Sequence, residues 1–170
     1  EFNSIVPLIK ELNKRDPKLN FLVTTVTLSS SKIFAAAKLP KTVHQFLPVD
    51  TPWIVDKFLK HWQPDTVIFV ESELWPNMLN ATAKVSKLLL LNARLSDKSF
   101  KRWCMIPSLA KFIYGKFAVV FASTESDQRK ISKFAKTVEF HGNLKHAVPA
   151  PAHPKKEVDA LAKFIGKRPF

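Results

Sequence analysis

Short apolar runs alternate with amphipathic segments along most of the chain. The runs carry Val, Ile, Leu and Phe at successive positions, which is typical of parallel β-strands covered on both faces. We expect strands at residues 21–28, 43–49, 66–71, 87–93, 118–124 and 137–143. The intervening segments place apolar residues at helical spacing. They predict helices at residues 2–14, 53–61, 76–85, 105–115 and 125–135.

The repeated alternation of strands and helices determines the expected fold class. Strand–helix–strand units predict an α/β fold with a right-handed parallel sheet between two layers of helices. The chain has only three glycines and contains no GxGxxG or Walker sequence. A dinucleotide site or a P-loop is therefore disfavoured.

The composition fits one basic globular domain. With 170 residues, 46% of them hydrophobic, the chain can bury a core of its own. Its net charge of +13 favours a polyanionic partner such as nucleic acid, an anionic membrane surface or a phosphorylated substrate. A basic surface without any such partner is an equal alternative.

The cysteine and histidine content and the hydropathy bear on whether the chain belongs to the disulfide-bonded, metal-binding or membrane-spanning proteins. Cys104 is the only cysteine, so the chain forms no internal disulfide, which fits a reducing compartment. The histidines are scattered without metal-binding spacing, so we expect no metal site. No apolar run approaches the roughly 20 residues of a membrane-spanning helix.

Both ends of the chain predict that it is a piece of a larger protein. The helix at 2–14 begins without a strand before it, and a proline-rich connector at 148–154 leads to a helical stretch at 155–165. A missing first strand would leave the strand at 21–28 with an unpaired edge.

Polar side chains gather where the predicted strands end. Ligands bind beyond the carboxyl ends of strands in open α/β sheets, so this pattern favours a binding site there. The alternative is that loops and helix caps are polar in any α/β protein. The residues are Glu71, Glu73, Asn92, Arg94, Ser123, Glu125, Asn143 and Lys145.

Three motifs resemble the signatures of one known family. ESELWPN (71–77), NARLSDKSFKRW (92–103) and GNLK (142–145) are similar, in order and spacing, to the bacterial transferases of 3-deoxy-D-manno-octulosonic acid (Kdo). The resemblance covers nearly the whole chain. It implies a GT-B glycosyltransferase, of which this chain resembles the N-terminal, Rossmann-like half with helices on both faces of the sheet. The HAV that follows GNLK departs from the family, which usually has an aromatic residue and an acid there.

The resemblance also implies substrates, location and domain limits. The family transfers Kdo from CMP-Kdo to the lipid A precursor at the cytoplasmic face of the bacterial inner membrane, without a further cofactor. Residues 1–147 would form the acceptor-side domain, without the family's first strand and membrane anchor. Residues 148–170 would begin the connection to a C-terminal domain that binds CMP-Kdo.

The resemblance also implies site residues. The family carries its catalytic base at the end of a stretch directly before the first helix; Glu1-Phe2-Asn3-Ser4 resembles that end, so Glu1 matches the base. An alternative is that Glu-Phe at the N-terminus is a cloning junction. The remaining positions, which we expect to bind substrate, are Glu71, Glu73, Asn92, Arg94, Ser96, Asn143 and Lys145.

Some interpretations stay open at this point. Glu71 and Glu73 would repel each other unless Arg94, Lys145 or a substrate lay between them. Otherwise Glu73 is a first-turn helix residue and Glu71 is solvated. Trp75 is expected to pack in the protein rather than bind sugar.

The segment 98–117 has two interpretations as well. It alternates basic and bulky apolar residues, which suits an anionic membrane surface with Phe100, Trp103 and Ile106 at the acyl boundary. The alternative is an amphipathic helix packed on the core. For the whole chain, a non-catalytic remnant or split subunit and a basic nucleic-acid-binding module are the competing functions, and no specific nucleic acid is expected.

Overall fold

The computed structural model describes residues 2–148 and 155–165. Its helices are α1 (Phe2–Arg15), α2 (Leu28–Ala37), α3 (Pro52–Trp62), α4 (Pro76–Thr82), α5 (Asp97–Met105), α6 (Pro107–Tyr114), α7 (Glu125–Ile131), the 3₁₀ helix η1 (Leu144–Ala147) and α8 (Lys155–Ile165). Its strands are β1 (Phe21–Thr25), β2 (Thr42–Phe46), β3 (Thr66–Val70), β4 (Lys87–Ala93), β5 (Val119–Ala122) and β6 (Val138–Glu139).

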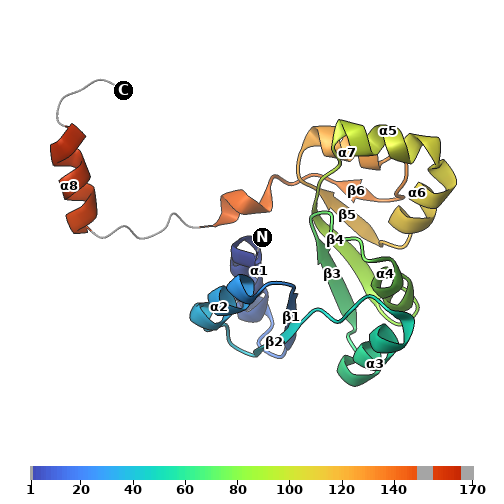
Figure 1. The fold of residues 1–170 in the computed structure, drawn as a ribbon, viewed down its shortest axis with the longest axis horizontal. Helices are drawn as coiled ribbons and strands as arrows, with labels where there is room; N and C mark the ends of the chain where they lie inside the picture. Colours follow the sequence, from blue (N-terminus) through green and yellow to red (C-terminus); the bar gives the residue numbers. More distant parts are fainter. Residues whose placement is uncertain (1, 149–154, 166–170) are drawn as a thin grey trace.

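All strand pairs are parallel, and the strands form two sheets (Figure 1). One sheet has the order β1-β2 and the other has the order β3-β4-β5-β6. The prediction of a parallel α/β fold with helices on both sides is confirmed, although the strands form two sheets instead of one. Among the described strands, β1 pairs only with β2 and β3 only with β4, so each has one edge without a partner strand.

Each sheet has its own hydrophobic core. The larger core packs the sheet β3–β6 against α3, α4, α6 and α7, and its largest fully buried apolar side chains are Val55, Leu79, Leu88, Leu90, Val120 and Ile131. The smaller core joins α1 to β1 through Phe2, Ile9, Val23 and Leu39. Apolar positions at helical spacing therefore predicted the helix faces that pack against these two cores.

Helix starts follow local chemistry. Thr124 caps α7 by accepting a hydrogen bond from the Asp127 amide, with Glu125 and Asp127 in the first turn. Pro76 and Pro107 occupy the first positions of α4 and α6, where the missing proline N–H leaves no bond unmade.

Several element predictions are wrong in extent. The helices expected at 76–85 and 125–135 end at Thr82 and Ile131, and the strand expected at 43–49 ends at Phe46. The strand expected at 21–28 ends at Thr25 because Thr27 caps α2, a helix that we did not predict. The helix expected at 105–115 is preceded by α5, and the two helices break at Ile106, where Pro107 disfavours helical backbone in the residue before it. The strand expected at 137–143 is only the two residues of β6.

The C-terminal helix α8 matches the stretch predicted at 155–165, and Figure 1 shows it apart from the two sheets. The predicted linker at 148–154 lies outside the described residues except for Val148, and the candidate base Glu1 lies outside them too. Within the described part of the chain, no helix has the length and apolar character needed to cross a bilayer.

Candidate functional site

The predicted site residues gather at one edge of the larger sheet. Because β3, β4, β5 and β6 are all parallel, their carboxyl ends lie at the same edge. Glu71 directly follows β3, Asn92 lies near the end of β4, and Asn143 lies beyond β6. Three motifs that are separated in the sequence therefore meet in space.

Glu71 is held by its backbone and by an ion pair. Its amide donates a hydrogen bond to the Leu91 carbonyl at 2.8 Å, and its backbone has a left-handed φ of 61°. That conformation costs an ordinary residue about 1–2 kcal/mol, so the surrounding structure must impose it. The Lys145 ammonium lies 2.8 Å from its Oε1, and only 12% of the Glu71 side chain is exposed. The alternative in which Glu71 is solvated is therefore wrong.

The surroundings of Glu71 set its ionisation. Burial alone would raise its pKa, but the hydrogen bond and positive charge of Lys145, with a weaker contribution from Arg94, outweigh burial. The net result is a pKa below the usual value of 4.5. Glu71 is therefore a fixed carboxylate at neutral pH.

Glu73 and Trp75 are engaged with each other. The Trp75 indole N–H donates a hydrogen bond to Glu73 Oε2 at 3.0 Å, while the Trp75 ring packs against the larger core, as predicted for a packing residue. Helix α4 begins only at Pro76, so Glu73 does not lie in its first turn. The alternative that gave Glu73 a first-turn role is wrong.

Asp50 orients the first motif, and sequence reasoning missed it. Its carboxylate accepts hydrogen bonds from the Asn77 amide at 3.1 Å and the Met78 amide at 2.7 Å, and the Asn77 side chain donates to the Asp50 carbonyl at 2.7 Å. Asp50 thus caps α4 from another segment, because the residue at the cap position is Trp75. Asp50 stands just before the Thr51-Pro52 that starts α3, but no local signal in the sequence points to its contact with α4.

Side chains of helix α7 hold the second motif in place. The buried Asp127 carboxylate accepts the Leu95 amide at 2.8 Å. The Lys130 ammonium contacts the Leu95 carbonyl at 3.1 Å and forms an ion pair with Asp97 at 2.6 Å. These contacts fix the turn between β4 and α5, so that Arg94 remains exposed at the sheet edge.

Ser96 and Ser72 shape the same turn. The Ser96 hydroxyl caps α5 by accepting the Ser99 amide at 3.2 Å. The Ser72 hydroxyl donates to the Arg94 carbonyl at 2.8 Å, which ties the first motif to the second. Ser96 therefore has a structural partner, and its expected contact with substrate stays a prediction.

The third motif brings Lys145 to Glu71. Gly142 has a φ of 97°, a conformation that side chains rarely adopt, so glycine is required for its backbone rather than for space. Asn143 then caps η1 by accepting the Lys145 amide at 2.9 Å. This turn directs Lys145 back toward the end of β3.

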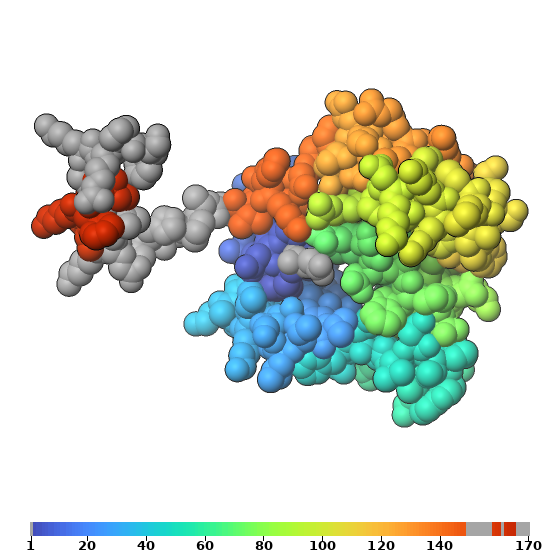
Figure 2. Space-filling model, turned by 45° about the horizontal axis from the view of Figure 1, so that its top comes forward, coloured from blue at the N-terminus to red at the C-terminus, as the bar shows by residue number. Residues whose placement is uncertain are grey.

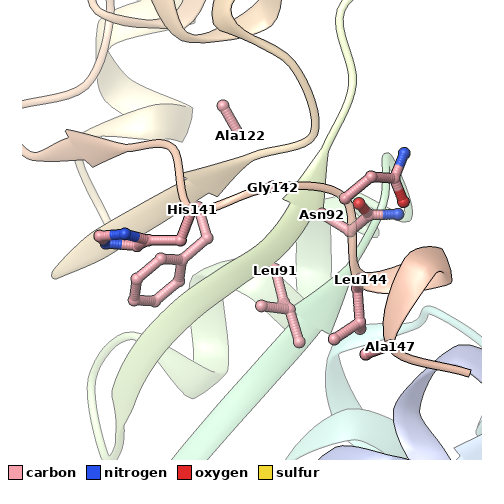
Figure 3. Close-up of a pocket in the computed structure, with 9 residues that line it drawn as sticks. Leu91, Asn92, Ala122, His141, Gly142, Leu144 and Ala147 are labelled. Atoms are coloured by element: carbon pink, nitrogen blue, oxygen red, sulfur yellow. The ribbon is translucent and has the colours of Figure 1, made fainter.

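A small hollow lies between the ends of β4, β5 and β6, with a volume of about 200 Å³ (Figure 3). Asn92 borders it with a left-handed φ of 55° and 2% exposure, and neither atom of its side-chain amide has a hydrogen-bond partner. Such buried unpaired groups are rare in native proteins. The lining residues are Leu91, Asn92, Phe121, Ala122, His141, Gly142, Asn143, Leu144 and Ala147.

The edge offers carboxylate, amide and cationic groups for a polar, anionic ligand. Arg94 and Lys145 supply positive charge, and Glu71 can accept hydrogen bonds from hydroxyl groups. No cluster of three or more His, Cys, Asp or Glu side chains suited to a metal ion occurs in residues 2–148 and 155–165. Of the predicted site residues, Glu71 contacts Lys145, and Asn92 and Asn143 line one hollow. Ser72 ties the first motif to the Arg94 carbonyl, whereas Glu73 and Ser96 bond within their own motifs and Glu1 lies outside the described residues.

The fold and the site place this protein in the class of parallel α/β domains with a charged site at the carboxyl edge of the sheet. A family model described as 3-deoxy-D-manno-octulosonic-acid transferase (kdotransferase) matches residues 1–148. The chain belongs to this family.

Several named relatives are similar over most of the chain. The 3-deoxy-D-manno-octulosonic acid transferase of Rickettsia felis is 42% identical over 170 residues, which is 99% of this chain and 36% of the relative. That of Rickettsia conorii is 47% identical over 82% of this chain and 30% of the relative. A probable mitochondrial 3-deoxy-D-manno-octulosonic acid transferase of Arabidopsis thaliana is 39% identical over 68% of this chain and 26% of the relative. The chain thus spans about a third of the length of the curated relatives it matches.

Proposed function

We propose that this chain is the acceptor-side domain of an enzyme that transfers Kdo from CMP-Kdo to a lipid A precursor in lipopolysaccharide biosynthesis. The observation that carries the proposal is the meeting of three family motifs at one sheet edge, with Lys145 of the third motif 2.8 Å from Glu71 of the first. A charged edge of this kind suits an acceptor that carries phosphate and hydroxyl groups.

The proposed chemistry is an inverting transfer. A glutamate removes the proton of an acceptor hydroxyl as that oxygen attacks the anomeric carbon of Kdo, and CMP leaves. By family resemblance, Glu1 holds the position of this base. Because Glu71 is fixed as a carboxylate by Lys145, it orients the acceptor or its cationic neighbours in this scheme rather than exchanging protons.

The other site residues divide by charge. Arg94 and Lys145 bind an acceptor phosphate or the Kdo carboxylate, while Glu73, Asn92, Ser96 and Asn143 serve as hydrogen-bonding groups of the edge. CMP-Kdo is held by a separate C-terminal domain of the family, and the proposal requires neither a metal ion nor another cofactor. The enzyme works at the cytoplasmic face of the bacterial inner membrane, whose anionic surface suits the net charge of +13.

A chimera tests this proposal directly. This chain replaces the segment that it matches in the Rickettsia felis relative, and Kdo transfer from CMP-Kdo to a lipid A precursor is measured. We expect transfer by the chimera and none by the 170 residues alone, because donor binding needs the rest of the enzyme.

Two results would contradict the proposal. One is a folded chimera, with CMP-Kdo bound, that transfers no Kdo to the lipid A precursor. The other is release of the chain from vesicles containing lipid A precursor by duplex DNA or RNA at equal charge concentration, which would favour the nucleic-acid-binding alternative.

A further inference from the structure

Four large apolar side chains are exposed where α5 meets α6. Met105 is 74% exposed, Ile106 49%, Leu109 47% and Phe112 56%. Leu109 and Phe112 lie three residues apart on α6, and Ile106 directly precedes this helix. We call these four residues the apolar corner. Figure 2 shows this segment, in yellow-green to yellow, at the surface of the molecule.

The helices that form the apolar corner are anchored from the inside. Phe100 and Trp103 pack against the larger core, and Ala110 and Tyr114 are buried in it. The expectation that Phe100 and Trp103 reach a membrane is therefore wrong, because they face inward. The exposed residues are instead the next ones along the chain, and they are presented by a rigid support.

Basic side chains surround the apolar corner. Lys98, Lys101 and Arg102 are exposed on α5 and precede Met105 at helical spacing. Lys111 is exposed on α6, and the Lys116 ammonium lies 3.9 Å from the centre of the Phe112 ring. We call these five residues the basic rim. The only acid between residues 97 and 116 is Asp97, which is paired with Lys130 at 2.6 Å.

We propose that the apolar corner and the basic rim dock this domain on an anionic lipid bilayer. The corner enters the boundary between head groups and acyl chains, and the rim contacts the anionic head groups. Nucleic acid would use the rim, but it would gain nothing from Met105, Ile106 and Leu109, which cannot stack on bases as aromatic side chains do. The inference rests on the proposed function for its cellular setting, but its test requires no catalysis.

The lone cysteine provides a direct test. Cys104 is exposed and adjoins the apolar corner, so a polarity-sensitive dye on its thiol reports on this surface without any substitution. We expect a blue shift of the dye emission on vesicles of phosphatidylcholine with phosphatidylglycerol, and quenching by nitroxide-labelled lipids. Neutral phosphatidylcholine vesicles and high salt should weaken the response.

Paired variants with matched controls separate the two parts of the surface. We expect Ile106→Ser with Leu109→Ser, and separately Lys101→Glu with Arg102→Glu, to lower vesicle affinity by about tenfold or more. The apolar control is Val26→Ser with Leu28→Ser, at positions 63% and 65% exposed, and the charge control is Lys84→Glu with Lys87→Glu. Both controls should bind vesicles as the parent chain does, and circular dichroism verifies the fold of every variant.

Three outcomes would overturn the proposal. The first is unchanged vesicle affinity in folded variants of the apolar corner or the basic rim. The second is a Cys104 dye that stays in water while the chain is bound to vesicles. The third is a dimer in vesicle-free buffer that the corner variants dissociate, which would make the corner an interface between copies. If the chimera still transfers Kdo in any of these cases, only the docking surface is wrong and the proposed function stands.

Discussion

At the scale of residues, charge and burial give neighbouring side chains different roles. Glu71 and Glu73 look alike in the sequence, yet Lys145 pairs with Glu71 while Glu73 accepts a hydrogen bond from Trp75. The motif indicated that a cation was needed near two carboxylates, but not which carboxylate would receive it. That choice depends on the turn at Gly142, whose φ of 97° directs Lys145 toward β3.

The ionisation of Tyr114 can be measured without interference from other tyrosines, because it is the only tyrosine in the sequence. Burial, and secondarily the charge of Asp127, raises its pKa from 10.0 to about 12. We expect the ultraviolet absorbance of tyrosinate to appear near pH 12 in the folded chain and near pH 10 in urea.

The same shift makes stability depend on pH. A raised acid pKa means that the contribution of neutral Tyr114 is full below pH 10 and is lost as the pH rises toward 12, because the unfolded chain ionises first. Tyr114→Phe should remove this part of the alkaline loss. A tyrosine that ionises near pH 10 in the folded chain would show that the ring is not buried.

At the scale of elements, the sequence predicted strand β4 more accurately than the two helices, α5 and α6, that follow it. The strand at 87–93 is confirmed with both its ends, since its apolar run is continuous and is followed by Asn and Arg. Helix α5 was expected only as the amphipathic alternative for 98–117, because it carries several basic residues. It is held by the Ser96 cap, by the Asp97–Lys130 ion pair with α7, and by Phe100 and Trp103 on the larger core. The contact of Asp50 with α4 was missed because it joins residues 27 and 28 positions apart.

Asp127 joins these elements, and its removal is the matching prediction. Asp127→Ala leaves the Leu95 amide without its partner in a buried position, which should lower the free energy of unfolding by about 2 kcal/mol. Asp127→Asn keeps an acceptor oxygen and should lose less. Asp56→Ala, at an exposed helical position, is the control, and urea unfolding is the measurement. Equal stability of Asp127→Ala and the control would contradict the role of Asp127.

At the scale of the whole molecule, two cores and two sheets replace the single sheet expected from the pattern. Alternating strands and helices predict parallel pairing, but they do not indicate which strands are neighbours, because pairing depends on contacts distant in sequence. The unpaired edge expected beside β1 is confirmed among the described strands, and β3 has another. Glu71 directly follows β3, and η1, which carries its partner Lys145, contacts α1 of the smaller core.

The central claim is that the motifs act as one acceptor site, and a double-mutant cycle tests it most directly. In the chimera, kcat/KM for Kdo transfer is measured for Glu71→Gln, Lys145→Met and the double variant. We expect each single change to lower kcat/KM by about tenfold or more, and the double variant to lose little beyond that, because the pair acts as a unit. The control is the exposed pair Glu11–Arg15 at 2.9 Å, where Glu11→Gln and Arg15→Met should leave transfer unchanged. Full transfer by both single variants at the Glu71–Lys145 pair would contradict the account.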